Sequence, residues 1–165
     1  MQKKMTNSRR TYFGADFQPT TGEPVYVRKK VISSKYITLE NNEAAWLKKL
    51  KQMSWAPKLI KADAEGILMT YVGKPVTAIT LPVDWKDQVT TILNDMVKIP
   101  CSHNDIKTEE ILILNGKIHL IDFQHMTDTR EEFIRKKRSG ECGCRINWTD
   151  HDAFFTILGN MEKRK

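Results

Sequence analysis

Long apolar runs are missing from this chain of 165 residues, and no stretch approaches the roughly 18 consecutive apolar residues of a membrane-spanning helix. No apolar stretch follows the basic residues near the N-terminus, so we expect no secretory signal. Cysteine is scarce, because there are only three, and Cys142 and Cys144 are separated by one residue. An odd, closely spaced set does not make a disulfide framework. These absences predict a protein of the reducing cytoplasm without a membrane span.

Motifs of the common nucleic-acid-binding modules are also missing. The chain has no zinc-finger spacing, no aromatic strand of the RNA-recognition type and no heptad repeat. It is nevertheless basic, with 27 Lys and Arg against 20 Asp and Glu, and much of the excess lies in short clusters. Such clusters bind acidic partners or nucleic acid, or they only keep a surface solvated. Charge alone therefore leaves an acidic or nucleic-acid partner open.

What is present is the composition of a globular protein. Hydrophobic residues make up 40% and charged residues 28% of the chain, which excludes disorder as a whole. The length suits one domain, or two small lobes that share a core. We expect a flexible basic arm at residues 1–10, a first lobe at 11–72 and a second lobe at 73–165.

Local patterns predict an α+β fold. Strands are expected at residues 10–32, broken by a turn at 18–22, and at 58–62 and 67–71. Apolar residues recur at spacings of three and four in residues 39–53, 84–98 and 150–161, which predicts three helices. Residues 111–121 hold two short apolar runs around Asn115-Gly116, the strongest short signal of a β-hairpin. Residues 128–145 are charged and are expected to form a long loop with a helical piece. The order favours an antiparallel sheet lobe joined to a mostly helical lobe.

Two aspartates flank the predicted hairpin. Asp105 precedes it, and Asp122 follows it directly. Because the strands of a hairpin are antiparallel, both aspartates are expected at the same end of it. Two converging carboxylates repel each other unless a cation or a proton lies with them, and magnesium prefers oxygen ligands. Taken singly, either aspartate is equally typical of a helix cap or a turn.

A lysine and a glutamate are expected to face the core. Lys29 shares a strand face with Val25 and Val27, and Glu43 lies in the helical row that contains Trp46 and Leu47. Charges that point at a core are costly unless they meet each other or an anion. The alternative is that both side chains extend from the core edge into water.

Together these residues resemble a known family. The segment from His103 to Ile113, followed by residues 118–124, resembles the catalytic loop and the metal-binding motif of protein-kinase-like enzymes. The resemblance covers residues 11–158, and its specific part is 103–124. Within the superfamily the chain is most similar to minimal kinases, namely the small kinase-like subunit of the tRNA-threonylcarbamoylation machinery and the lipopolysaccharide kinases. The resemblance implies a two-lobed fold with a reduced C-terminal lobe.

It also implies roles for single residues. Asp105 would orient or deprotonate the acceptor hydroxyl, and Lys107 would approach the transferred phosphoryl group. Lys29 would neutralise the ATP phosphates while Glu43 holds it. His103 would be structural, and an aspartate at position 150 or 152 would brace the catalytic loop. Binding of ATP and Mg²⁺ would involve the following residues: Val27, Lys29, Met69, Thr70, Tyr71 and Val72 for the nucleotide, Asp122 for both, and Glu110 for the metal.

The sequence departs from the family in several places. Glu110 stands where the family has an asparagine that ligates the second metal ion, and Gln124 stands where it has a glycine. No glycine-rich phosphate loop is visible, and a shift by one residue would put Arg28 or Lys30 in the place of Lys29. A large helical substrate lobe is missing, too.

The expected activity is an ATP- and Mg²⁺-dependent transfer of the γ-phosphate to a hydroxyl. The acceptor would be a serine or threonine of a protein, including this chain itself, or a small molecule. Two alternatives stay open: a pseudokinase or nucleotide-binding scaffold without transfer, and a basic RNA-binding module.

Overall fold

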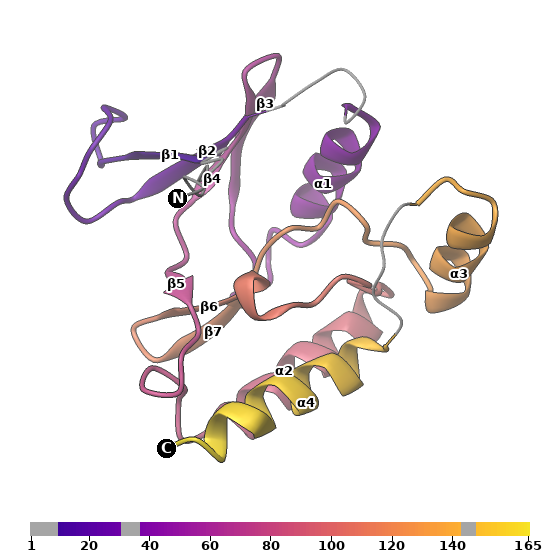
Figure 1. Ribbon diagram of the computed structural model, residues 1–165. Helices are drawn as coiled ribbons and strands as arrows, with labels where there is room; N and C mark the ends of the chain where they lie inside the picture. Colours follow the sequence, from indigo (N-terminus) through magenta and orange to yellow (C-terminus); the bar gives the residue numbers. More distant parts are fainter. Residues whose placement is uncertain (1–9, 31–36, 143–147) are drawn as a thin grey trace, which may run out of the picture.

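The computed structural model describes residues 10–30, 37–142 and 148–165 (Figure 1). The predicted arm at 1–10 lies almost entirely outside the described residues, as does the end of the strand expected up to residue 32. Within these three ranges the chain forms two β-sheets and four α-helices.

The N-terminal half contains a four-stranded antiparallel sheet with one helix. The strands are β1 (Arg10–Phe13), β2 (Tyr26–Lys29), β3 (Leu59–Asp63) and β4 (Gly66–Thr70), in the order β1-β2-β4-β3. Side chains alternate along a strand, and on β2 this alternation buries Val27 and Lys29 on the same face. Helix α1 (Ile37–Lys49) packs against β3 and β4.

Helix α1 ends earlier than its apolar pattern predicts. The pattern runs to Met53, but the helix ends at Lys49, and a turn follows in which the Met53 N–H donates to the Leu50 carbonyl. Leu50 is completely buried in this turn, and Trp55 and Ala56 beyond it are buried as well. The apolar residues thus reach the core from a turn, so their spacing overstated the length of the helix.

The C-terminal half combines a small sheet with three α-helices. Strand β5 (Lys74–Pro75) pairs with β6 (Ile111–Leu114), which forms the predicted hairpin with β7 (Lys117–Leu120). The turn of this hairpin places Asn115 and Gly116 at positive φ, the conformation that an Asn-Gly turn favours. Helices α2 (Trp85–Lys98) and α4 (Asp150–Glu162) lie side by side below the hairpin in Figure 1, and α3 (Arg130–Arg138) stands apart.

The two halves share one hydrophobic core. Val27 of the first sheet and Leu47 of α1 belong to the same buried cluster as three residues of the C-terminal half: Val89 of α2, Phe154 of α4, and Phe123 in the segment after β7. The predicted α+β class with antiparallel sheets is therefore confirmed. In the part of the chain that the structure describes, no helix has the length and apolar character needed to cross a membrane.

A glycine joins the halves closely. Gly73 has a φ of +112°, and a Cβ built on it would lie 2.1 Å from the carbonyl oxygen of Ile113. Only glycine tolerates both this dihedral angle and this approach. The backbone at Gly73 is therefore held directly against strand β6, which places the end of β4 over the hairpin.

Candidate functional site

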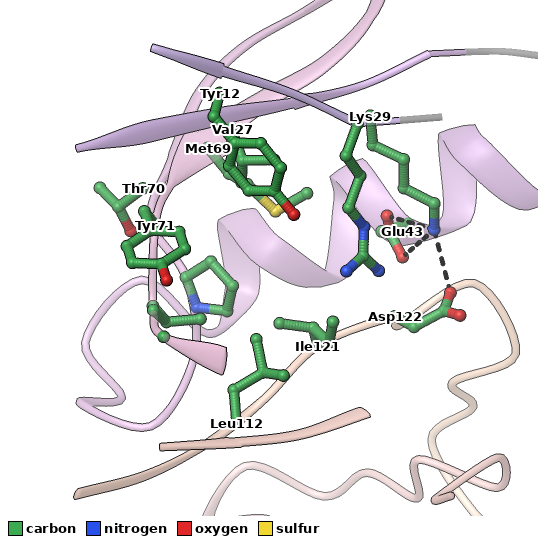
Figure 2. A pocket seen from close by; sticks show the side chains of 14 residues that line it. Tyr12, Val27, Lys29, Glu43, Met69, Thr70, Tyr71, Leu112, Ile121 and Asp122 are labelled. Atoms are coloured by element: carbon green, nitrogen blue, oxygen red, sulfur yellow. Dashed lines mark hydrogen bonds and ion pairs between the residues drawn. The ribbon is translucent and has the colours of Figure 1, made fainter. Parts of the chain in front are cut away.

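The side chain of Lys29 connects three elements that are distant in sequence. Its Nζ lies 3.1 and 3.2 Å from the two carboxylate oxygens of Glu43 on α1, and 3.0 Å from Oδ1 of Asp122 after β7 (Figure 2). Lys29 is 4% exposed and Glu43 is 1% exposed. The ion pair expected between these two residues is present, and Asp122 is a second partner.

Burial and charge act against each other in this group. Burial lowers the pKa of Lys29, but the charges of Glu43 and Asp122 outweigh it and raise the pKa above its usual value. Burial also raises the pKa of Glu43, to about 7, against the opposing effect of Lys29. Burial also acts to raise the pKa of Asp122, yet the charge of Lys29 keeps the pKa of Asp122 below its usual value. Asp122 is therefore ionised at neutral pH.

The neighbours of Lys29 on its strand point elsewhere. Arg28 lies on the opposite face of the sheet, where its guanidinium stacks over Phe13 at 5.2 Å and pairs with Glu65 at 3.4 Å. Lys30 is exposed. Of the three cations considered from the sequence, Lys29 is the one that reaches Glu43 and Asp122.

The hairpin brings the expected carboxylates together. Strand register pairs Ile111 with Leu120, so the residues that flank the hairpin lie at one end of it. Oxygen atoms of Asp105, Glu110 and Asp122 lie within 4.8 Å of one another. The convergence predicted for Asp105 and Asp122 is confirmed, and Glu110 joins them from the short 3₁₀ turn η2 (Thr108–Glu110).

Lys107 partly balances this acidic group. Its Nζ lies 3.4 Å from Oδ2 of Asp105 and 3.7 Å from Oε1 of Glu110. Burial, reinforced by the charges of Asp122 and Asp105, raises the pKa of Glu110 to about 7, although Lys107 opposes the rise. The other oxygen of Glu110, Oε2, is buried and has no hydrogen-bond partner in the structure. A buried carboxylate oxygen without a partner is costly.

These residues fit a hard divalent cation. Three carboxylates converge on one point, one of their oxygen atoms lacks a partner, and oxygen is the ligand that Mg²⁺ prefers. Together with an ionised Glu43, these three carboxylates would carry four negative charges against the two positive charges of Lys29 and Lys107, a net charge of −2 that a divalent cation would balance. Asp105, Glu110 and Asp122 are thus the residues that could hold the metal. From the sequence, the hairpin pointed to Asp105 and Asp122 as neighbours of a cation, and the family resemblance to Asp122 and Glu110 as metal ligands; the structure brings all three together.

The segment before Asp105 is held by Asp150 at the start of α4. The Asp150 carboxylate accepts the backbone N–H groups of His103 at 2.7 Å and Asn104 at 2.9 Å. His103 is completely buried, and its Nδ1 accepts the Asp105 N–H, so Nε2 carries the proton donated to the Ile121 carbonyl. Asp150 braces this segment, whereas Asp152 is exposed. A structural position for His103 is likewise observed.

Two residues of the site have strained backbones. Asn104 has a φ of +72° and Asp122 a φ of +67°, although neither is glycine. The Asn104 amide donates to the carbonyls of Ser102 and His125 and to the hydroxyl of Thr127, which offsets the strain. Residues with strained backbones persist only where surrounding contacts hold them, and they are found more often at functional sites than elsewhere.

A cleft lies beside the Lys29 group. The empty space between its lining residues, open solvent included, is about 380 Å³. The residues predicted to bind the nucleotide all line it: Val27, Lys29, Met69, Thr70, Tyr71, Val72 and Asp122. Figure 2 shows Leu112 and Ile121 on the opposite side of the cleft from Val27 and Met69. Asp105, Lys107 and Glu110 do not line this cleft but adjoin it through Asp122.

Sequence reasoning missed several lining residues. Leu112 and Ile121 were assigned only to the hairpin, although alternation along its strands could have indicated which face they occupy. Arg10 and Tyr12 of β1 also line the cleft, and Tyr12 meets Tyr71 edge to face at 6.0 Å. The turn expected at residues 18–22 lies between these strands, but no pattern in the sequence gives the register that puts Arg10 opposite Lys29.

Asn42 was missed as well. Its side-chain amide donates to the carbonyls of Gln124 at 2.9 Å and Met126 at 3.0 Å. It thereby fastens α1, which carries the neighbouring Glu43, to the segment that follows Asp122. A half-buried asparagine on a helix has no sequence signal that would identify this contact.

Comparison with known proteins adds no assignment, because no protein-family model and no curated protein matches this chain.

Proposed function

We propose that this protein is a minimal kinase-like phosphotransferase, which transfers the γ-phosphate of ATP to a hydroxyl in the presence of Mg²⁺. One observation carries the proposal. Lys29 is held between Glu43 and Asp122 at the edge of a cleft, and Asp105 and Glu110 converge with Asp122 at the same point. A cation, a metal-binding carboxylate and a second carboxylate near a cleft are what phosphoryl transfer by positioning and charge neutralisation requires.

The cleft supports binding of a flat, largely apolar base. Val27 and Met69 on one side and Leu112 on the other offer apolar surfaces for an adenine ring. The N–H groups of Thr70 and Tyr71 already donate to the carbonyls of Lys58 and Val25. Hydrogen bonds from backbone N–H groups to the base would therefore come from residues beyond Tyr71.

The residues around Asp105 support transfer to a hydroxyl. The Asp105 carboxylate would accept the proton of the attacking hydroxyl, and Lys107, 3.4 Å from it, would place positive charge beside the transferred group. Lys29 would contact phosphate oxygens while Glu43 and Asp122 keep its side chain in place. Bound Mg²⁺ would supply charge neutralisation of the phosphates. A protein serine or threonine, or a small-molecule alcohol, would serve as the acceptor.

A transfer assay tests the proposal. The protein is incubated with γ-labelled ATP and Mg²⁺. Water, serine peptides and simple alcohols are offered as acceptors, and self-phosphorylation is measured by the intact mass of the protein. We expect transfer by the wild type and its loss in Asp105→Asn and Asp122→Asn. Asp87→Asn, which changes an exposed aspartate on α2, is the matched control and should retain transfer.

Glu110 favours a second candidate, a nucleotide-binding scaffold without transfer. A third carboxylate near Asp105 and Asp122 changes the charge of the site compared with the asparagine of the kinase-like family. In that case ATP and Mg²⁺ raise the melting temperature, yet no phosphate is transferred. A chain that neither binds nor uses ATP, but is retained on RNA in a salt-dependent way, contradicts both candidates and indicates a basic RNA-binding module.

A further inference from the structure

Arg10 lies beside Lys29 in the first sheet. Strands β1 and β2 pair so that Arg10 is directly opposite Lys29, and directly opposed residues project from the same face. Arg10 lines the same cleft as Lys29 and Asp122. Burial alone would raise the pKa of Asp122. The charge of Lys29 lowers this pKa, and the charge of Arg10 lowers it to a smaller extent. The guanidinium is thus near the end of the cleft where Lys29 and Asp122 meet.

The loop between β1 and β2 cannot readily offer its backbone to a phosphate. It contains only two glycines, Gly14 and Gly22, and many of its N–H groups already have acceptors. Gly14 donates to the Gln18 carbonyl and Phe17 to the Gly14 carbonyl. The other engaged N–H groups are those of Gln18, Thr20, Gly22 and Val25.

The loop is also closed by its side chains. Phe17 stacks on Tyr26 of β2 with ring centroids 4.2 Å apart. Opening the loop to cradle a phosphate would break this contact as well as the internal hydrogen bonds. The positive charge of Lys29, in turn, is shared between Glu43 and Asp122. A triphosphate in the cleft therefore needs another donor.

We infer that Arg10 is a ligand of the polyphosphate chain of the nucleotide, in the place of the backbone amides of a glycine-rich loop. The inference rests on the proposed function. Guanidinium groups suit this task, because they stay charged at all physiological pH values and form paired hydrogen bonds with phosphate oxygens. Arg10 therefore distinguishes nucleotides by their phosphates and has no part in binding the base.

Titration with adenosine, AMP, ADP and a non-hydrolysable ATP analogue tests the inference. Calorimetry with Mg²⁺ compares the wild type with Arg10→Gln and Arg10→Lys. The matched control is Arg28→Gln, which removes the same charge from the neighbouring strand but on the opposite face of the sheet. Thermal unfolding of each variant shows that the fold is kept.

We expect Arg10→Gln to bind the ATP analogue at least about tenfold more weakly than the wild type, while adenosine binding is unchanged. Arg10→Lys should recover part of the loss, and Arg28→Gln should bind both ligands like the wild type. If wild type and Arg10→Gln bind the ATP analogue equally well, the inference is wrong and the proposed function stands. The same holds if Arg10→Gln weakens the binding of adenosine as much as that of the ATP analogue. If the wild type binds no ATP analogue at all, the proposed function fails and the inference falls with it.

Discussion

The carboxylate of Asp150 accepts the backbone N–H of His103 at 2.7 Å, although 47 positions separate the two residues. The same carboxylate also accepts the N–H of Asn104, so the first turn of α4 determines the conformation of the chain just before Asp105. Two N–H groups that donate to one ionised acceptor form strong hydrogen bonds. The position of Asp105 therefore depends on a helix at the other end of the C-terminal half.

Removal of this brace should affect both stability and transfer. In Asp150→Ala two buried N–H groups lose their acceptor, so we expect the free energy of unfolding to fall by about 3 kcal/mol. The transfer rate should fall more than the affinity for ATP, because the cleft is not lined by Asp150. Asp152→Ala, in the same helical turn but exposed, is the control. Equal effects of the two substitutions would contradict the role of Asp150.

Asn42 should act on transfer from outside the cleft. In Asn42→Ala the carbonyls of Gln124 and Met126 lose a shared donor, and α1 is no longer fastened to the segment after Asp122. We expect a loss of stability of about 1–2 kcal/mol and a lower transfer rate. Asn41→Ala changes an exposed neighbour on the same helix and serves as the control. Chemical denaturation and the transfer assay measure the two effects, and unchanged transfer in Asn42→Ala would show that the contact is only structural.

Gly73 should tolerate no side chain. In Gly73→Ala the new Cβ meets the Ile113 carbonyl at 2.1 Å, and the φ of +112° is strained for alanine. The expected loss of stability is on the order of 3–4 kcal/mol. Gly116→Ala is the matched control, because Gly116 also has a positive φ but no atom within 4 Å of the added Cβ. The free energy of unfolding of Gly116→Ala, measured by chemical denaturation, should fall by only about 1 kcal/mol. A similar fall in both variants would mean that the backbones of Gly73 and Ile113 are not in close contact.

The stability of the metal-free protein should depend on pH through Glu43. The pKa of this carboxyl is raised by burial from its ordinary value of 4.5 to about 7, so the folded state holds a proton that the unfolded state releases between these values. The contribution of Glu43 to stability is therefore complete below about pH 4.5 and is lost as the pH rises towards 7. Glu43→Gln carries no titrating group and should show a weaker decline than the wild type between about pH 5 and pH 8 in urea unfolding. A decline of the same size in both would exclude Glu43 as its source.

The hairpin shows how far local patterns reach. The Asn115-Gly116 turn and its apolar flanks suffice to predict the hairpin, and antiparallel geometry then places Asp105 near Asp122 without further information. Alternation on the strand and spacing on the helix likewise predict that Lys29 and Glu43 face the core, but these patterns leave open whether the two charges meet, which the structure shows. Helix α1 shows the limit, since its apolar spacing continues into a turn and predicted an end four residues too late.

Contacts between distant elements could not be predicted in this way. The pairing of Arg10 with Lys29, the contact of Asn42 with the chain after Asp122, and the choice of Asp150 over Asp152 all depend on how whole elements pack. A sequence pattern states which face of an element is buried, but it does not state which element covers that face.

The sequence by itself determined the α+β class, the hairpin and the convergence of its two flanking aspartates, because periodicity and turn chemistry act over a few residues. Only the tertiary structure decided which cation meets Glu43 and Asp122, that Glu110 completes a group of three carboxylates, and that Arg10 lines the cleft. Those relationships come from the packing of the two halves around one core. The burial that this packing produces also raises the pKa of Glu43 and Glu110 and leaves one oxygen of Glu110 without a partner.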